Sequence, residues 1–229
     1  MDRSEIQRIA WEEMGCRVEH SSREPGWIYF HGLRTAKLAL WLADELRANV
    51  DHDLLYIAGL FHDVGKGKRS HNEVGALRAR ELLADSCLPA ELIQIEEMIV
   101  GHCLRGQPGQ SLPVHILQDA DILDHIGPIG PWLAYYWSGS KGESFAEHVR
   151  FYQSEDIRHT RQKMYAQLNF EPSRMEYIRR IRWEDEVMQT LHAAYEEGVW
   201  TSRPGAEAAA LWSPDVIDPV SGSEGGQES

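Results

Sequence analysis

One segment, residues 53 to 62, limits the folds open to this chain, because it is apolar on nearly every side of a helix. Its apolar residues are Leu54, Leu55, Ile57, Ala58, Leu60 and Phe61. A helix of this kind is usually buried in the middle of a domain, so other helices must surround it. The segment ends in His62-Asp63 and runs into Val64-Gly65-Lys66, where a glycine can stop the helix and turn the chain.

Helical periodicity continues along most of the chain. Apolar residues recur with a period near 3.6 over 33 to 48, and further helices are predicted over 70 to 85, 89 to 103, 113 to 126 and 172 to 197. Ser70 and Glu73 have the spacing of a capping box, which places His71 in the first turn of the helix they begin. We find no alternation typical of strands, so the predicted fold class is all-α.

Several stretches interrupt this pattern. Glycine and proline break it at 127 to 131, and the polar residues 138 to 160 are predicted to form a mobile loop or lid. The tail from 213 to 229 has almost no large apolar residues and is predicted to be disordered. We interpret the aromatic residues between 132 and 137 as core or a dimer face, with base stacking as the alternative.

Composition excludes some classes of function. A formal net charge of -13 argues against duplex nucleic acid as a partner, because phosphate backbones select basic surfaces. The three cysteines fit a reducing cytoplasm, where free thiols persist. The first residues lack the layout of a signal peptide, and no apolar stretch is long enough to span a bilayer. We therefore expect a cytoplasmic protein with no membrane partner.

The chemistry is concentrated at His62-Asp63. An imidazole and a carboxylate buried side by side at the end of an apolar helix are costly unless something pairs with them. A divalent metal is a suitable partner, since both groups bind it in their deprotonated forms. Neighbouring residues on a helix point about 100° apart, so both reach one ion only at a helix end, which is where this pair lies.

Four elements in order, His31, His62-Asp63 in Phe61-His62-Asp63-Val64-Gly65-Lys66, and Asp121, resemble the H…HD…D motif of the HD superfamily. The stretch 118 to 124, QDADILD, is similar to one found in small stand-alone members. The resemblance covers about 25 to 130 and extends to the C-terminal helix from Lys163-Met164 to Glu197. It implies an HD-domain helical bundle of about seven to ten helices: one domain over 1–212, with the metal core at about 25–130 and C-terminal helices over 160–212.

The resemblance also implies a site and an activity. The expected metal ligands are His31, His62, Asp63 and Asp121, with Asp119 and Asp124 as weaker candidates for the last position. These ligands suit Mn²⁺, Fe²⁺ or Co²⁺ better than Ca²⁺. The expected reaction is hydrolysis of a phosphate ester or anhydride by a water molecule that the metal activates. The expected substrate is a small phosphate compound, with a nucleotide favoured.

Two further histidines, His71 and His102, resemble the extra ligands of HD proteins that hold two metals, as in HD-GYP phosphodiesterases and HD oxygenases. The HD-GYP pattern requires another histidine after His102 and a Gly-Tyr-Pro downstream, whereas Cys103 and Leu104 follow here. We expect one ion, with a second ion or a substrate phosphate at His71 and His102 as the alternative. A diiron oxygenase and a non-catalytic, metal-stabilised regulatory or binding module remain the alternative functions.

Three residues are candidates for catalysis. Asp63 can accept a proton from water as well as bind metal, and Lys66 and Arg34 can hold a phosphate group. Lys66 can equally serve only the dipole of the preceding helix, and Arg34 only a surface ion pair. His125 lies one turn after Asp121 and is predicted either to orient a ligand or to pack. A homodimer is compatible with all of these roles.

Overall fold

The computed structural model describes residues 2–18 and 23–197, with side chains to residue 195. These ranges contain ten α-helices, one short 3₁₀ helix and no strand, which confirms the all-α prediction. The helices are α1 (Arg3–Met14), α2 (Trp27–Glu45), α3 (His52–Phe61), α4 (His71–Leu83), α5 (Pro89–Gly101), α6 (Leu112–Asp124), η1 (Gly127–Ile129), α7 (Gly130–Ser140), α8 (Phe145–Tyr152), α9 (Glu155–Ala166) and α10 (Glu171–Glu197). The predicted tail at 213–229 lies outside the described residues.

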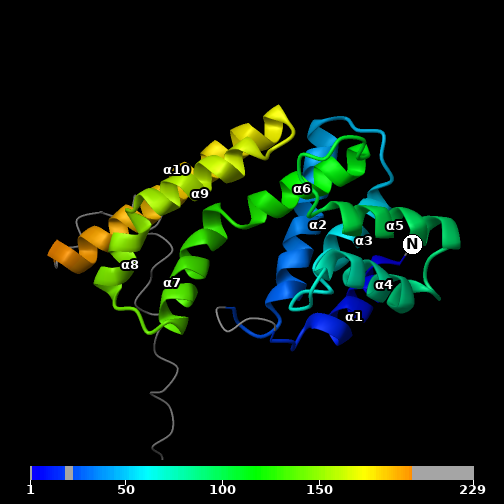
Figure 1. The fold of residues 1–229 in the computed structure, drawn as a ribbon, viewed down its shortest axis with the longest axis horizontal. Coiled ribbons are helices and arrows are strands. Elements are labelled where there is room, and N and C mark those ends of the chain that lie inside the picture. The colour runs from blue at the N-terminus through cyan, green and yellow to red at the C-terminus, as the bar shows by residue number, and fades with distance from the viewer. Residues whose placement is uncertain (1, 19–22, 198–229) are drawn as a thin grey trace, which may run out of the picture. The chain divides into compact units, whose positions relative to one another are not determined.

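Helix α3 forms the centre of the core, as its apolar sequence predicts. Every residue from Leu54 to Phe61 is buried, and α1, α2, α5 and α6 pack around it. Figure 1 shows α2 and α3 side by side, with α4, α5 and α6 close to them. Asp51 starts the helix by accepting hydrogen bonds from the backbone N–H groups of Asp53 and Leu54. The His-Asp pair therefore follows directly after a helix whose last eight residues are all buried.

Small residues let α2 and α3 approach closely. A Cβ atom on Gly32 would lie 2.3 Å from the carbonyl oxygen of Leu60, and one on Gly59 would lie 2.7 Å from Cα of Ala36. Both contacts are with backbone, which cannot move aside as a side chain does. Because Gly32 follows His31 and Leu60 is two residues before His62, this crossing fixes the distance between the two histidines.

The region after α6 differs from the prediction. Residues 138–160 were expected to form a mobile loop or lid, but they contain the end of α7, all of α8 and half of α9. Ser144 starts α8 in a capping box with Glu147, and Ser154 caps α9 by accepting from the N–H of Ile157. The capping side chains satisfy free N–H groups at the starts of α8 and α9, so both segments form helices although their sequences are polar. The loop prediction is wrong for this reason.

The start of α4 corrects a second prediction. Ser70 does precede the helix, but its backbone is left-handed, with φ of 52°, and its side chain caps no N–H group. N-cap residues use an extended backbone to direct the side chain back at the helix, so Ser70 cannot form the predicted capping box. His71 nevertheless lies in the first turn, as expected.

A second apolar cluster joins α6 to the C-terminal helices. It contains Ile122, Leu123 and Ile126 together with Leu168 and Tyr177. The contacts divide the chain into two compact units, Met1–Met188 and Gln189–Ser229, and the features below all belong to the first. The single domain over 1–212 stays a prediction. Within the described ranges, no helix is both long and apolar enough to cross a membrane.

Candidate metal centre

The four predicted ligands, His31, His62, Asp63 and Asp121, meet at one buried place, here called the four-ligand site. His31 comes from α2, His62 and Asp63 follow α3, and Asp121 comes from α6. Nε2 of His31 lies 3.1 Å from Nε2 of His62 and 3.2 Å from Oδ1 of Asp121. Nε2 of His62 lies 3.6 Å from the same oxygen. Three separate helices thus deliver ligand atoms to one point.

Three of the histidines around this point share a local structure. His62, His102 and His125 each occupy the C-cap position of a helix, α3, α5 and α6 respectively. In each case Nδ1 donates to a backbone carbonyl of the last turn, those of Gly59, Ile99 and Asp121. These carbonyls have no partner within the helix, so the histidines satisfy them while turning Nε2 outward. The negative ends of three helix dipoles therefore face the site and favour a cation.

His31 is oriented by a different partner. Its Nδ1 donates to Oδ2 of Asp124 at 2.7 Å, which leaves Nε2 free to face His62 and Asp121. Arg34, one turn after His31, donates to both oxygens of Asp124 at 2.8 and 3.0 Å. Asp124 therefore fixes the ring of His31, and Arg34 fixes Asp124.

Helix periodicity separates the three aspartates of α6. Asp121 and Asp124 are three residues apart and share the face toward the site, whereas Asp119 points away from it. The buried carboxylate of Asp119 accepts hydrogen bonds from the backbone N–H groups of Asn169 and Phe170 at 2.9 and 3.1 Å. Asp119 thus ties α6 to the segment that leads into α10 and has no contact with the metal ligands.

The two oxygens of Asp63 face different partners. Oδ2 lies 3.9 Å from Nε2 of both His31 and His62, while Oδ1 lies 3.5 Å from Nε2 of His71 and 3.7 Å from that of His102. Lys66 places Nζ 2.9 Å from Oδ2, and its side chain is about half exposed. Asp63 is therefore shared between the four-ligand site and a second group of histidines.

The pKa shifts follow from these contacts. Burial opposes the charged form of His31, but the carboxylates of Asp121 and Asp124 outweigh it and raise the pKa to about 9. Burial likewise opposes ionisation of Asp63 and Asp121, yet the surrounding imidazoles hold both carboxyl pKa values well below the ordinary range. Both aspartates are therefore carboxylates near neutral pH, the form that binds metal.

The donor set fits a divalent transition metal. His31 and His62 each use Nδ1 as a donor, so their Nε2 atoms, 3.1 Å apart, both face the site. A divalent cation competes with the extra proton of His31 for these nitrogens, and the ionised carboxylates of Asp63 and Asp121 complete its surroundings. HD domains bind divalent metals, and two histidines and two carboxylates suit Mn²⁺, Fe²⁺ or Co²⁺.

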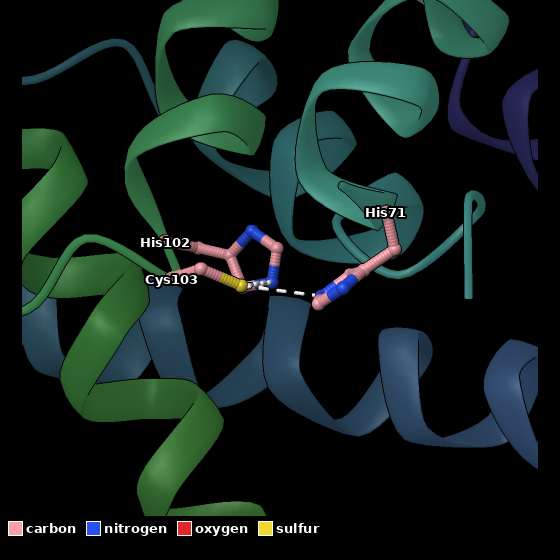
Figure 2. A group of neighbouring side chains, drawn as sticks. All are labelled: His71, His102 and Cys103. Carbon is pink, nitrogen blue, oxygen red and sulfur yellow. Dashed lines mark hydrogen bonds between the residues drawn. The ribbon is translucent and has the colours of Figure 1, made fainter. Parts of the chain in front are cut away.

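The second group consists of His71, His102 and Cys103. In Figure 2 a dashed line joins the sulfur of Cys103 to His71; the sulfur lies 3.2 Å from Nε2 of His71 and 3.0 Å from Nε2 of His102. The ligand atoms of the three residues lie within 4.8 Å of one another. The structure thus brings both extra histidines of the prediction together and adds a thiol.

Sequence reasoning gave too little weight to three side chains. Asp124 was a weak candidate for a ligand, and its contact with His31 is detectable only as a shared helix face with Asp121. Arg105 donates to Oδ2 of Asp121, and Cys103 contacts His71 and His102. No short motif indicates the contacts of Arg105 and Cys103, because these contacts depend on the geometry of the loop after α5. Lys66 and Arg34 lie at the edge of the site, and their catalytic roles stay predictions.

Residues 28–126 match the family described as HD domain. These residues form an HD domain. Among curated proteins it is similar to the bifunctional uridylyltransferase/uridylyl-removing enzyme of Bordetella parapertussis, with 42% identity over 72 residues. That match covers 30% of this chain and only 8% of the relative's length.

Solved structures agree with this fold. Bacillus subtilis YpgQ in complex with ADP has a TM-score of 0.56 and 16% identity, covering 83% of this chain and 98% of that one. An HD-superfamily hydrolase from Bacillus thuringiensis has a TM-score of 0.59 and 17% identity, covering 84% of this chain and 97% of that one. The HD-domain protein described here therefore has the fold of HD-superfamily hydrolases.

Asp124→Asn is expected to weaken metal binding about 10- to 100-fold, because the amide is a poorer acceptor for Nδ1 of His31 and leaves Arg34 without its anion. Isothermal titration with Mn²⁺ measures the effect. Asp85→Asn, at an exposed position, is the matched control and should bind as the wild type does. Unchanged affinity in Asp124→Asn would show that the ring of His31 does not need this partner.

Proposed function

We propose that this HD-domain protein hydrolyses a phosphoester or phosphoanhydride bond of a nucleotide, with one divalent metal held by His31, His62, Asp63 and Asp121. The observation that carries the proposal is that Nε2 of His31 and Nε2 of His62 lie 3.1 Å apart and that both face a carboxylate oxygen of Asp121 and of Asp63. A bound divalent metal supplies an activated water molecule and neutralises charge on the phosphate oxygens.

We assign a different role to each of the residues around the metal. Asp63 stays ionised, so it serves as a ligand and accepts a hydrogen bond from the attacking water. Lys66 carries its ammonium group at the exposed rim, where it can exchange its contact with Asp63 for one with a substrate phosphate. Arg34 is held by Asp124, so we assign it to positioning His31. Arg105 adds a positive charge beside Asp121.

A cavity of about 310 Å³, lined in part by His125, supports a nucleotide as substrate. His125 also contacts the backbone carbonyl of Asp121, so the wall of the cavity includes a neighbour of one proposed ligand. The rings of Trp137 and Phe151 stack with centroids 4.8 Å apart, and Tyr152 also lines the cavity. An aromatic wall next to a phosphate site suits a nucleobase.

The relatives support the same substrate class. YpgQ binds ADP in its solved structure, and the Bordetella relatives are named for removing a uridylyl group, which is a nucleotide group.

A screen of phosphate release with added Mn²⁺ tests the proposal. We expect nucleoside di- or triphosphates to be hydrolysed with kcat/KM about two- to tenfold above inorganic pyrophosphate and simple sugar phosphates, since one good aromatic contact contributes about 0.5–1.5 kcal/mol beyond its buried area. Trp137→Ala should reduce the rate on nucleotides more than that on base-free substrates. Release from base-free substrates alone would exclude the nucleotide.

The diiron oxygenase remains a second candidate, because Asp63 faces His71 and His102 as well as the four-ligand site. Protein prepared without chelator would then contain two irons and consume O₂, with no phosphate released from any compound of the screen. Metal analysis and an oxygen electrode, run on the same preparation, separate the two functions.

A further inference from the structure

The cavity that His125 lines contains a pair of charged side chains, although most of its lining is apolar. Arg161 of α9 and Glu184 of α10 share this cavity with the rings of Trp137 and Phe151. Nη2 of Arg161 donates to Oε1 of Glu184 at 2.8 Å, and Glu184 is only 6% exposed. Replacing a buried ion pair with apolar residues is often neutral for stability, so stability alone does not account for a charged pair at this place.

Glu184 keeps acceptor capacity for a ligand. Its Oε2 accepts from the backbone N–H of Gly127 at 2.8 Å, and its Oε1 accepts from Arg161. The hydroxyl of Tyr152 lies 3.3 Å from Oε1 but 3.0 Å from Oδ1 of Asp185, so its single proton is donated to the nearer oxygen, that of Asp185. A carboxylate has about four acceptor positions, so about one stays available at each oxygen of Glu184.

Arg161 has donors for the same ligand. Its Nη2 contacts Glu184 and the hydroxyl of Tyr152, and its Nη1 contacts Oδ1 of Asp185. These contacts use both N–H groups of Nη2 and one of Nη1. The N–H of Nε and the second N–H of Nη1 therefore have no hydrogen-bond partner among the residues that the structure describes.

The backbone fixes the place of the carboxylate. A Cβ atom on Gly130, at the start of α7, would lie 2.0 Å from Oε2 of Glu184, so only glycine leaves room for this oxygen. Burial raises the pKa of the Glu184 carboxyl, but the charge of Arg161 and the hydrogen bond from Gly127 oppose this shift by favouring the carboxylate. A carboxylate held in this way accepts hydrogen bonds from a ligand without rearranging.

Neighbouring donors and acceptors distinguish one nucleobase from another. Guanine has a carbonyl oxygen, a ring N–H and an amino group in a row along one edge, which is one acceptor followed by two donors. Arg161 can donate to the carbonyl oxygen, while the two oxygens of Glu184 accept from the N–H and the amino group. Adenine and cytosine would turn a ring nitrogen lone pair toward the carboxylate, and uracil has one N–H between two carbonyls. A site that hydrogen-bonds its substrate rejects an analogue that leaves its buried polar groups unpaired.

We propose that Glu184 and Arg161 recognise the base of a guanine nucleotide. This recognition rests on the proposed function, because it specifies the base of a nucleotide substrate. Stacking on Trp137 and Phe151 is available to every base and does not distinguish among them. The hydrogen bonds to Glu184 and Arg161 therefore set the preference between bases, in addition to the stacking that all nucleotides share.

Isothermal titration with the α,β-methylene diphosphates of guanosine and adenosine tests the preference, since their P–C–P bridge is not hydrolysed. We expect Kd for the guanine compound to be at least about tenfold lower than for the adenine compound in the wild type, as for hydrogen bonds to a charged group. In Glu184→Gln the two Kd values should come to within about threefold, because the amide nitrogen brings donors to an edge that itself presents donors.

Asp185→Asn is the matched control. Asp185 contacts the same Arg161 and Tyr152 as Glu184 does, but it is not part of the cavity lining. We expect this variant to keep the guanine preference, whereas a network that serves only to hold α9 and α10 together would respond alike to both substitutions. Phosphate release from inorganic triphosphate should be the same in Glu184→Gln and the wild type, because this substrate has no base.

Circular dichroism checks that each variant is folded. If Glu184→Gln is unfolded, Arg161→Lys replaces it, since lysine keeps the ion pair with fewer N–H groups and should also reduce the guanine preference. Equal affinity of the wild type for the two compounds, or an unchanged preference in the folded variant, overturns the proposal. Equal affinities together with phosphate release would reject only the recognition of guanine. A guanine preference with no phosphate released from any nucleotide would support that recognition and reject the proposed hydrolysis.

Discussion

Asp63→Ala is expected to lower kcat/KM for phosphate release at least a thousandfold. The substitution removes the carboxylate whose two oxygens face the two groups of histidines, and a metal contributes several kcal/mol to stabilising the transition state, where each 1.36 kcal/mol is tenfold in rate. Elemental analysis of the purified variant should show that the metal content falls together with the rate.

Asp44→Ala is the matched control for this experiment. Asp44 lies on α2, as His31 does, but its side chain is mostly exposed and remote from the ligands. Its variant should keep both the metal and the activity. An Asp63→Ala protein that retained full metal content and a rate within tenfold of the wild type would contradict the proposed mechanism.

The second large effect is on stability. Gly32→Ala is expected to lower the free energy of unfolding by about 2–3 kcal/mol, because the added methyl group would meet the carbonyl oxygen of Leu60 and push α2 away from α3. Denaturant titration followed by circular dichroism measures the loss. The same displacement moves His31 from His62, so metal affinity should fall as well.

Gly139→Ala is the matched control for the stability of Gly32→Ala. Gly139 lies on α7, is exposed, and has no heavy atom within 4 Å of the position its Cβ would take. Alanine should leave the stability within about 1 kcal/mol of the wild type, or raise it slightly through its higher helix propensity. Equal stability of the wild type and Gly32→Ala would mean that the two helices are not so closely packed.

Sequence patterns were sufficient to predict the helices that form the buried parts of the fold. The all-round apolar character of 54 to 61 predicted a central helix, and the period of α2, α5 and α6 predicted their positions to within a few residues of one end or both. These segments are decided by burial, which a single sequence records directly. α8 and α9 depend instead on their N-terminal caps. Ser144 and Glu147 form a capping box, whereas Ser70 and Glu73 have the same spacing and do not form the one that was predicted. The spacing alone does not distinguish an extended backbone from a left-handed one.

The residues of the candidate site likewise include some that the sequence predicts and some that it does not. His31, His62, Asp63 and Asp121 could be named from the order of a motif, and the structure brings them together. The residues that orient these ligands could not be predicted in this way. Asp124, for example, contacts His31 although the two are 93 residues apart in the sequence. Cys103 likewise meets His71 only through the packing of α4 on α5. Such contacts depend on how helices pack in three dimensions, which no local pattern contains.

Because the carbonyl ends of α3, α5 and α6 all face the predicted metal ligands, part of the attraction for a cation belongs to the backbone and does not depend on which side chains are present. Substitutions at the ligand positions can therefore change which metal is selected without first having to create a place where positive charge is stable. His62, the C-cap histidine of α3, is one of the proposed ligand positions. For protein engineering, this scaffold is accordingly a starting point for exchanging one metal for another, one ligand at a time.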